Sequence, residues 1–186
     1  MTPPPRLEEV RAGRLAVAAL ALVLSACETI PEAQCPKVDW YALGVEDGRA
    51  GYSAERLADH RKACDGVRVE PDERAWLEGR RAGLTESCAP PRAIENGLAG
   101  RGYAGVCSDP RYGRLYRAAR RVHDARAKVA EIDRDLASAR RDLASNEQSG
   151  VLRRQVTGLA NDRARAVDEA LEAQRALDAL RRELRA

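Results

Sequence analysis

Five cysteines are the residues of this 186-residue chain whose positions indicate chemistry. Cys27 follows Leu24-Ser25-Ala26 at the end of the apolar run Leu15–Leu24, and this resembles the site at which a bacterial signal peptidase cuts before a lipid-bearing cysteine. The run has ten residues, whereas a spanning helix needs about 20, so it predicts a signal peptide. A short buried helix is the alternative. We expect residues 1–26 to be removed and a fatty modification such as palmitate on Cys27.

The other four cysteines predict two disulfide bonds, because small domains outside the cytoplasm are commonly cross-linked. Three pairings of Cys35, Cys64, Cys88 and Cys107 are possible. We favour Cys35–Cys64 with Cys88–Cys107, which requires the chain to reverse near residues 51–53, since one unbroken helix would hold the first two sulfurs over 30 Å apart. A zinc site is the less favoured reading, because the sequence lacks Cys-x-x-Cys.

Asp47 and the pair Asp59-His60 are the polar residues nearest to an enzyme-like grouping. A hydrolase needs a nucleophile, a base and an orienting acid within reach of one another, and no Gly-x-Ser-x-Gly motif supplies the nucleophile. We expect His60 to lie at a helix end or to bond a carbonyl, and Asp47 to make a local hydrogen bond or ion pair. The sequence therefore predicts no catalytic residue, no metal and no cofactor.

The elements that position these residues are expected to be helical, and the C-terminal part shows this most clearly. Residues 114–186 contain no proline or cysteine, and their apolar positions alternate in steps of three and four, as in a coiled-coil seam. The first half of the seam is Leu115, Ala118, Val122, Ala125, Val129, Ile132, Leu136, Ala139 and Leu143. The second half is Leu152, Val156, Leu159, Arg163, Ala166, Ala170, Ala173, Leu177, Leu180 and Leu184.

A polar cluster at residues 145–150 interrupts this seam and ends in Gly150. Turn chemistry of this kind lets two helices fold back as an antiparallel hairpin of about 45 Å. One continuous helix that dimerises is the alternative. The charge is also divided, because residues 28–113 carry twelve basic and fifteen acidic residues, whereas residues 114–186 carry seventeen basic and twelve acidic residues.

The middle part contains a weak internal repeat. An aromatic residue, two residues, Gly, three residues and Gly occur from Tyr41 and again from Trp76. Glycines at four-residue spacing lie along one face of a helix. Each glycine destabilises a helix by about 1 kcal/mol relative to alanine, so the absence of side chains on this face must serve a purpose. We favour close approach of a neighbouring helix, and a ligand groove is the alternative. Further helices are expected at 54–63 and from Pro71 to about Ser87, with Cys88-Ala89-Pro90-Pro91 as a stop.

Several separated motifs occur in order: Trp40-x-x-x-Gly44-x-x-Asp47-Gly48-x-x-Gly51, His60-Arg61-Lys62-x-Cys64, Gly79-x-x-x-Gly83 with Cys88, Glu95-Asn96-Gly97, and Tyr103-x-Gly105-Val106-Cys107. From about Cys35 to Tyr116 the chain resembles the bacterial lipoproteins grouped as "domain of unknown function 2799". The resemblance implies a small proteobacterial envelope lipoprotein and no known reaction. Ser87 stands where an aromatic residue is common, and the heptad arm extends past the usual end of the family.

These observations predict an all-α fold, with a small disulfide-bonded, Gly-rich helical domain followed by a long antiparallel helical hairpin. The expected parts are a signal peptide (1–26), a tether extended by two prolines (27–36), the disulfide-bonded domain (37–113) and the coiled-coil hairpin (114–186). Glu28 after Cys27 resembles sorting to the outer membrane, so we expect a lipid-anchored protein on its periplasmic face.

The expected role is a structural or interaction module, with an envelope protein or a second copy bound through residues 114–186 and no nucleic acid. The alternative is a periplasmic enzyme, such as a hydrolase, or a small-ligand binder that uses a Gly-rich cleft near His60 and Asp47. A formed pocket that holds these two residues and an aromatic side chain would favour this alternative.

Overall fold

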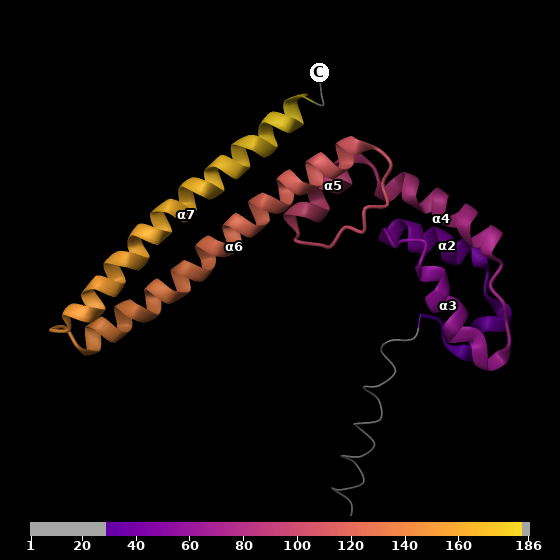
Figure 1. Cartoon of the computed structure of the whole chain (residues 1–186), viewed down its shortest axis with the longest axis horizontal. Helices are drawn as coiled ribbons and strands as arrows, with labels where there is room; N and C mark the ends of the chain where they lie inside the picture. The colour runs from indigo at the N-terminus through magenta and orange to yellow at the C-terminus, as the bar shows by residue number, and fades with distance from the viewer. Residues whose placement is uncertain (1–28, 184–186) are drawn as a thin grey trace, which may run out of the picture.

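The computed structural model describes residues 29–183, and every regular element in that range is a helix. The expected all-α fold is therefore confirmed for this part of the chain. Figure 1 shows a long two-helix arm beside a smaller group of short helices. The elements are η1 (Glu32–Lys37), α2 (Trp40–Ala50), α3 (Arg56–Cys64), η2 (Asp65–Val67), α4 (Glu73–Ser87), α5 (Pro90–Leu98), α6 (Pro110–Ser145) and α7 (Gly150–Glu183).

Helices α2 and α4 pack through their glycines, and this explains the internal repeat. A Cβ atom on Gly44 would lie 2.1 Å from the carbonyl oxygen of Trp76, and one on Gly79 would lie 2.0 Å from that of Tyr41. Gly48 and Gly83 make equivalent contacts. The two helices run in the same direction, because later residues of α2 meet later residues of α4. The close helix approach favoured from the sequence is thus observed, and backbone fills the face that a ligand groove would need.

Local signals set the ends of these two helices. The side chain of Asp39 accepts the Ala42 N–H at 3.0 Å and starts α2, which stops at Gly51 in the left-handed conformation (φ 76°). Asp72 accepts the Ala75 N–H at 3.0 Å and starts α4. The expected start at Pro71 is wrong, because the capping carboxylate belongs to the following residue.

The two disulfides join Cys35 to Cys64 and Cys88 to Cys107, which is the pairing favoured from the sequence. The first bond joins η1 to the end of α3, and the reversal that it needs falls between α2 and α3. Cys35 is 1 % exposed and Ile30 is 4 % exposed, so these two side chains attach the segment 29–36 to the domain. The expected extended tether is therefore not observed from residue 29 onward, because an apolar side chain and a cross-link fold this segment back.

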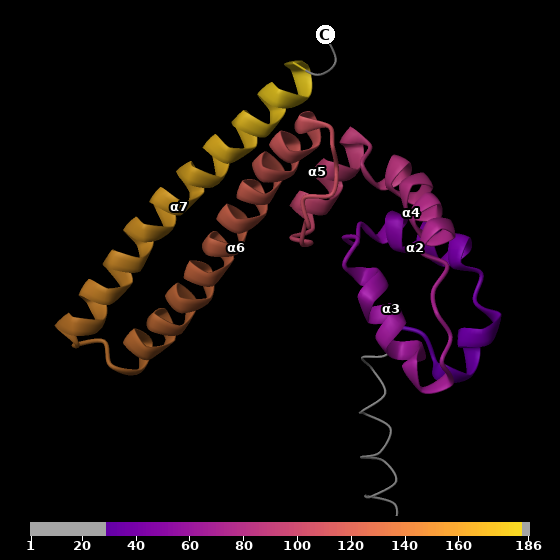
Figure 2. The ribbon, with the colours of Figure 1, turned by 45° about the vertical axis from the view of Figure 1, so that its right-hand side comes forward.

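Helices α6 and α7 form the arm as an antiparallel hairpin, whose two helices lie side by side in both views (Figures 1 and 2). The hairpin is observed rather than the single continuous helix, and its turn covers residues 146–149. The predicted seam is the buried face: Leu115, Val122, Leu136, Ala139, Ala166 and Leu177 are all at most 4 % exposed. Among the predicted seam positions between residues 115 and 180, Arg163 is the exposed one, because its guanidinium leaves the seam and pairs with Asp133. Leu184 lies outside the described residues.

Helix α5 packs along the start of α6 and gives the base of the arm a third helix. A Cβ atom on Gly97 would lie 2.6 Å from the Tyr116 carbonyl oxygen, and Ala93 is fully buried against the same helix. The expected stop at residues 88–91 is confirmed, because α4 ends at Ser87. Pro90 and Pro91 then occupy the first turn of the next helix, α5, where no N–H is needed. Helix α6 begins at Pro110, so the expected boundary at 113 and 114 falls inside one helix.

Candidate functional site

A buried carboxylate joins three helices of the small domain. Asp47 of α2 lies with its Oδ2 atom 2.7 Å from Nε2 of His60 on α3. The indole N–H of Trp76 on α4 donates to the same oxygen at 2.8 Å. The three side chains are 5 %, 1 % and 0 % exposed. A buried carboxylate is costly unless it is hydrogen-bonded, so these contacts fix the relative positions of the three helices.

Thr29 extends this network toward the surface. Its Oγ1 atom lies 2.8 Å from Nδ1 of His60, on the opposite side of the ring from Asp47. Because a carboxylate only accepts, Nε2 donates to Asp47, and in the neutral ring Nδ1 accepts the hydroxyl proton of Thr29. A hydroxyl, an imidazole and a carboxylate thus stand in line. This is the order in which a carboxylate orients an imidazole that takes a proton from a hydroxyl nucleophile.

Two arginines surround the carboxylate. Nε of Arg56 lies 4.0 Å from Oδ1 of Asp47 and is buried without a hydrogen-bond partner, while its guanidinium stacks over Tyr52 at 4.6 Å. Arg80 donates to the carbonyl oxygen of Tyr52 at 2.9 Å. Burial lowers the pKa of Arg80, and the charge of Asp47 opposes this effect. Both guanidiniums compensate the buried negative charge.

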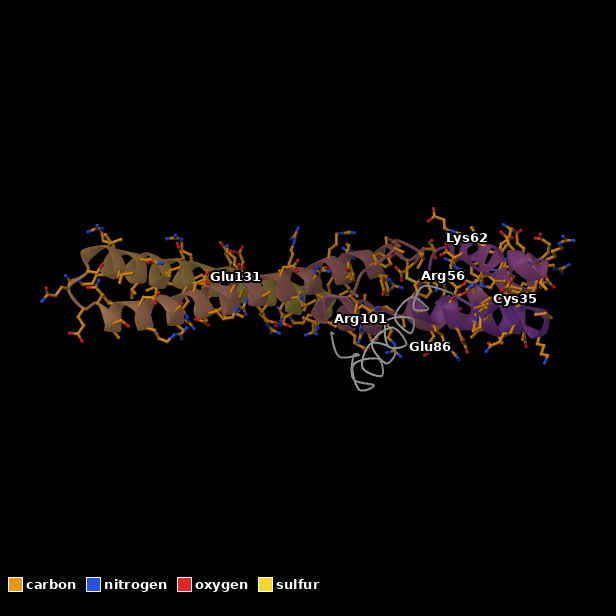
Figure 3. The ribbon with its side chains drawn as sticks, turned by 90° about the horizontal axis from the view of Figure 1, so that it is seen from below. Cys35, Arg56, Lys62, Glu86, Arg101 and Glu131 are labelled. Atoms are coloured by element: carbon orange, nitrogen blue, oxygen red, sulfur yellow. A yellow bond between two sulfur atoms is a disulfide. The ribbon has the colours of Figure 1, made fainter. Side chains whose placement is uncertain are left out.

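A cavity of about 540 Å³ opens directly beside Thr29. Figure 3 shows Arg56 and Lys62, two of its lining residues, at the small-domain end of the molecule, whereas Glu131 lies out along the arm. The lining contains two cations and two carboxylates, so its charge is balanced. Its lining residues include Thr29, Glu32, Arg56, Asp59, Lys62 and Gly66.

Two other surface hollows differ in character. One, of about 330 Å³, lies over α2, α4 and α5, where exposed Arg49, Arg92 and Arg101 alternate with Glu86 and Glu95 in a chain of ion pairs. Exposed pairs of this kind contribute little to stability. The other, of about 420 Å³, is a groove between α6 and α7 near the base of the arm, with an alanine-rich floor and arginine and glutamate rims.

The structure brings Asp47 and His60 together with an aromatic residue, but as a packed centre rather than as an open pocket. We expected His60 to bond a carbonyl or to lie at a helix end. Its ring nitrogens instead bond a carboxylate and a hydroxyl. Asp59 pairs with Arg56 at 3.4 Å and lines the cavity. Cys27 lies outside the described residues. Within residues 29–183, no three His, Cys, Asp or Glu side chains are grouped so that they could hold a metal ion.

Sequence reasoning missed Thr29 and the pairing of Trp76 with Asp47. Thr29 belongs to no sequence motif. Only the folded structure shows that its hydroxyl bonds the imidazole of His60. The Trp76 contact had one weak signal, since the glycine repeat places the two helices side by side and so brings the indole near the carboxylate of the first helix. Tyr112 was also unassigned. It is 3 % exposed, accepts from Asn96 at 3.1 Å, and has its pKa raised by burial.

The fold and this centre define a helical, doubly disulfide-bonded domain with a long hairpin arm. Residues 39–122 of the chain match the model of the family described as Protein of unknown function (DUF2799). The match runs from the cap of α2 to the part of α6 that packs on α5, so the outer arm extends beyond it. Searches of curated proteins and of solved structures find no match to the chain. In the described part of the chain, no helix is both long and apolar enough to span a bilayer.

Proposed function

We propose that the protein is a lipid-anchored protein of the bacterial cell envelope that acts as an interaction module. Its N-terminal cysteine, Cys27, carries the lipid, the disulfide-bonded domain forms a rigid base, and the α6–α7 arm binds a protein partner. The outer membrane, on its periplasmic face, is the proposed location. The observation that carries the proposal is the order of these parts, since a cross-linked body begins directly after the sequence Leu24–Cys27.

The cysteines support a location outside the cytoplasm. All four cysteines of the described part are disulfide-bonded, and such bonds persist in oxidising compartments. A small domain with little apolar core also needs such cross-links, and the cluster around Cys35 and Cys64 has Ile30 as its third buried member.

The arm supports a role in binding rather than in catalysis. Helix α7 has 34 residues, which correspond to about 51 Å at 1.5 Å per residue. Beyond the α5 contact, the outer two-helix part of the arm has a thin seam, and most of its residues are exposed. Such a long and narrow element adds little to the stability of the small domain, so a contact with another molecule is the role that it fits.

A shortened arm tests the proposal. Lys128 faces Glu169 across the hairpin, so deletion of residues 130–143 together with 154–167 removes facing segments of two heptads each. The turn and the base of the arm are kept. We expect cross-linking in cells to join an envelope protein to the intact chain and to the control Gly158→Ala, and not to the shortened chain. Equal cross-linking of the same protein by all three chains would contradict a binding role of the arm.

A second candidate function uses the Thr29–His60–Asp47 line. The specific observation is that Thr29 both bonds the imidazole and lines the cavity, which places a hydroxyl beside a space for an ester substrate. The measurement is hydrolysis of p-nitrophenyl acetate by the chain and by its Thr29→Val variant, both shown to be folded by circular dichroism. If the chain is a hydrolase of this kind, the Thr29→Val variant will lose all hydrolysis above background. Equal hydrolysis rates of the chain and the variant would rule this candidate out.

A further inference from the structure

The distance along the chain between Cys27 and the folded domain has a structural consequence. Thr29 is fixed by its hydrogen bond to His60, and Ile30 is buried in the next position. Two Cα–Cα steps of about 3.8 Å separate residues 27 and 29, so their Cα atoms lie within about 8 Å of one another. Each headgroup layer of a bilayer is about 5–8 Å thick. A lipid on Cys27 therefore leaves no length of chain for a separate tether.

We propose that the face around Thr29 rests on the phospholipid headgroups, so that the small domain is seated on the membrane rather than suspended from it. This inference rests on the proposed lipid anchor at Cys27. The anchor face consists of Thr29, Glu32, Arg56, Asp59, Lys62 and the exposed Val67.

The charges of this face fit zwitterionic headgroups, such as phosphatidylethanolamine or phosphatidylcholine. The cations Arg56 and Lys62 suit the phosphate, and the carboxylates Glu32 and Asp59 suit the positively charged ammonium group. Arg56 and Asp59 already pair at 3.4 Å with the aspartate 60 % exposed, so they need no rearrangement to offer both signs at the surface.

The shape of the face agrees with this role. The 540 Å³ cavity gives the headgroup layer an opening beside the point where the chain enters the domain. Val67 of η2 is 40 % exposed next to the cavity residue Gly66, and an apolar side chain at this place can enter the interface. The Cys35–Cys64 bond holds η1 to α3, so the parts of the face cannot separate.

Lysine labelling tests the seating, because Lys37, Lys62 and Lys128 are the only lysines of the chain. The protein is the mature lipidated chain on phosphatidylcholine vesicles, which carry no primary amine, and the reagent is a sulfonated ester that reacts with primary amines. The labelled sites are identified by mass spectrometry. The unseated reference is the Cys27→Ser chain, produced without residues 1–26 and mixed with the same vesicles. We expect Lys62 of the lipidated chain to react about fivefold more slowly than in the reference, since the interface excludes the reagent. Lys128 on the arm reports the dose of reagent.

An insertion variant separates seating from anchoring. Twelve Gly and Ser residues placed after Glu28 keep the lipid but lengthen the path to Thr29, so the reactivity of Lys62 is expected to return to that of the reference. Equal reactivity of Lys62 in the lipidated, the inserted and the Cys27→Ser chains would overturn the seating while the intact mass still shows the lipid. An intact mass without lipid would instead overturn the proposed anchor itself.

Discussion

Gly48 of α2 lies directly against the backbone of Arg80 of α4, where a Cβ atom would come within 2.2 Å of the carbonyl oxygen. Backbone cannot move away as the end of a flexible side chain can, so the missing side chain is a requirement of the fold. The same relationship at Gly44, Gly79 and Gly83 makes the four glycines one continuous contact between the two helices.

Substitution of Gly48 by alanine is expected to destabilise the small domain by about 1–3 kcal/mol, because overpacking outweighs the gain of about 1 kcal/mol in helix propensity. The matched control is Gly158→Ala on the exposed surface of α7, where a Cβ atom meets nothing within 4 Å. The control is expected to be neutral or stabilising by up to about 1 kcal/mol. Urea unfolding measures both. A neutral Gly48→Ala would contradict the close packing of α2 on α4.

Removal of the buried carboxylate is expected to cost more than removal of an exposed one. The Asp47→Ala variant leaves the N–H groups of His60 and Trp76 without an acceptor, and we expect a loss of about 2–4 kcal/mol in the free energy of unfolding. Asp59→Ala, on the exposed side of α3, serves as the control and is expected to stay within about 0.5 kcal/mol. Equal effects would mean that the buried network does not hold the helices together.

The Cys35–Cys64 bond is expected to stabilise the chain by about 3–4 kcal/mol, from the entropy of a loop of this length. The bond closes a segment with a sequence separation of 29 residues. Replacement of both cysteines by alanine should lower the urea midpoint and also make residues near Thr29 and Ile30 exchange their amide hydrogens rapidly. Unchanged exchange at these residues would show that packing alone keeps η1 in place.

The start of α6 is expected to weaken in acid. Asp109 caps this helix by accepting the Arg111 N–H at 2.8 Å, and hydrogen bonds from Arg111 hold the pKa of the carboxyl below its ordinary value. A lowered pKa means that the contribution is complete above the ordinary pKa of about 3.9 and is lost as the pH falls through the lowered value. Asp109→Asn should therefore show a smaller loss of melting temperature below pH 4 than the parent chain.

The arm could be predicted from the sequence almost residue by residue, because its packing repeats along one dimension. Leu115, Val122 and Leu177 were placed in the seam by spacing alone, and all three are buried. The same spacing assigns Arg163 to the seam, but its guanidinium forms an ion pair with Asp133 outside the seam. Periodicity predicts on which face of a helix a residue lies. It does not predict the direction that a long charged side chain takes from that face.

The centre of the small domain could be predicted only in part. Asp47 and His60 were selected from the sequence, but their contact joins two helices across a turn, and no spacing rule gives such a distance. Thr29 was placed in a tether because Pro31 and Pro36 suggested an extended chain. The burial of Ile30 and the disulfide at Cys35 outweigh that preference, and both depend on what the segment meets in three dimensions.

The mass of the intact protein, purified from the membranes of cells that make it and kept unreduced, tests the central claim most directly. The account predicts a chain that begins at Cys27, carries a diacylglycerol and lacks four hydrogen atoms because of two disulfides. It also predicts no free thiol after unfolding. A full-length chain recovered without lipid and with free thiols would contradict the anchor and the envelope role together.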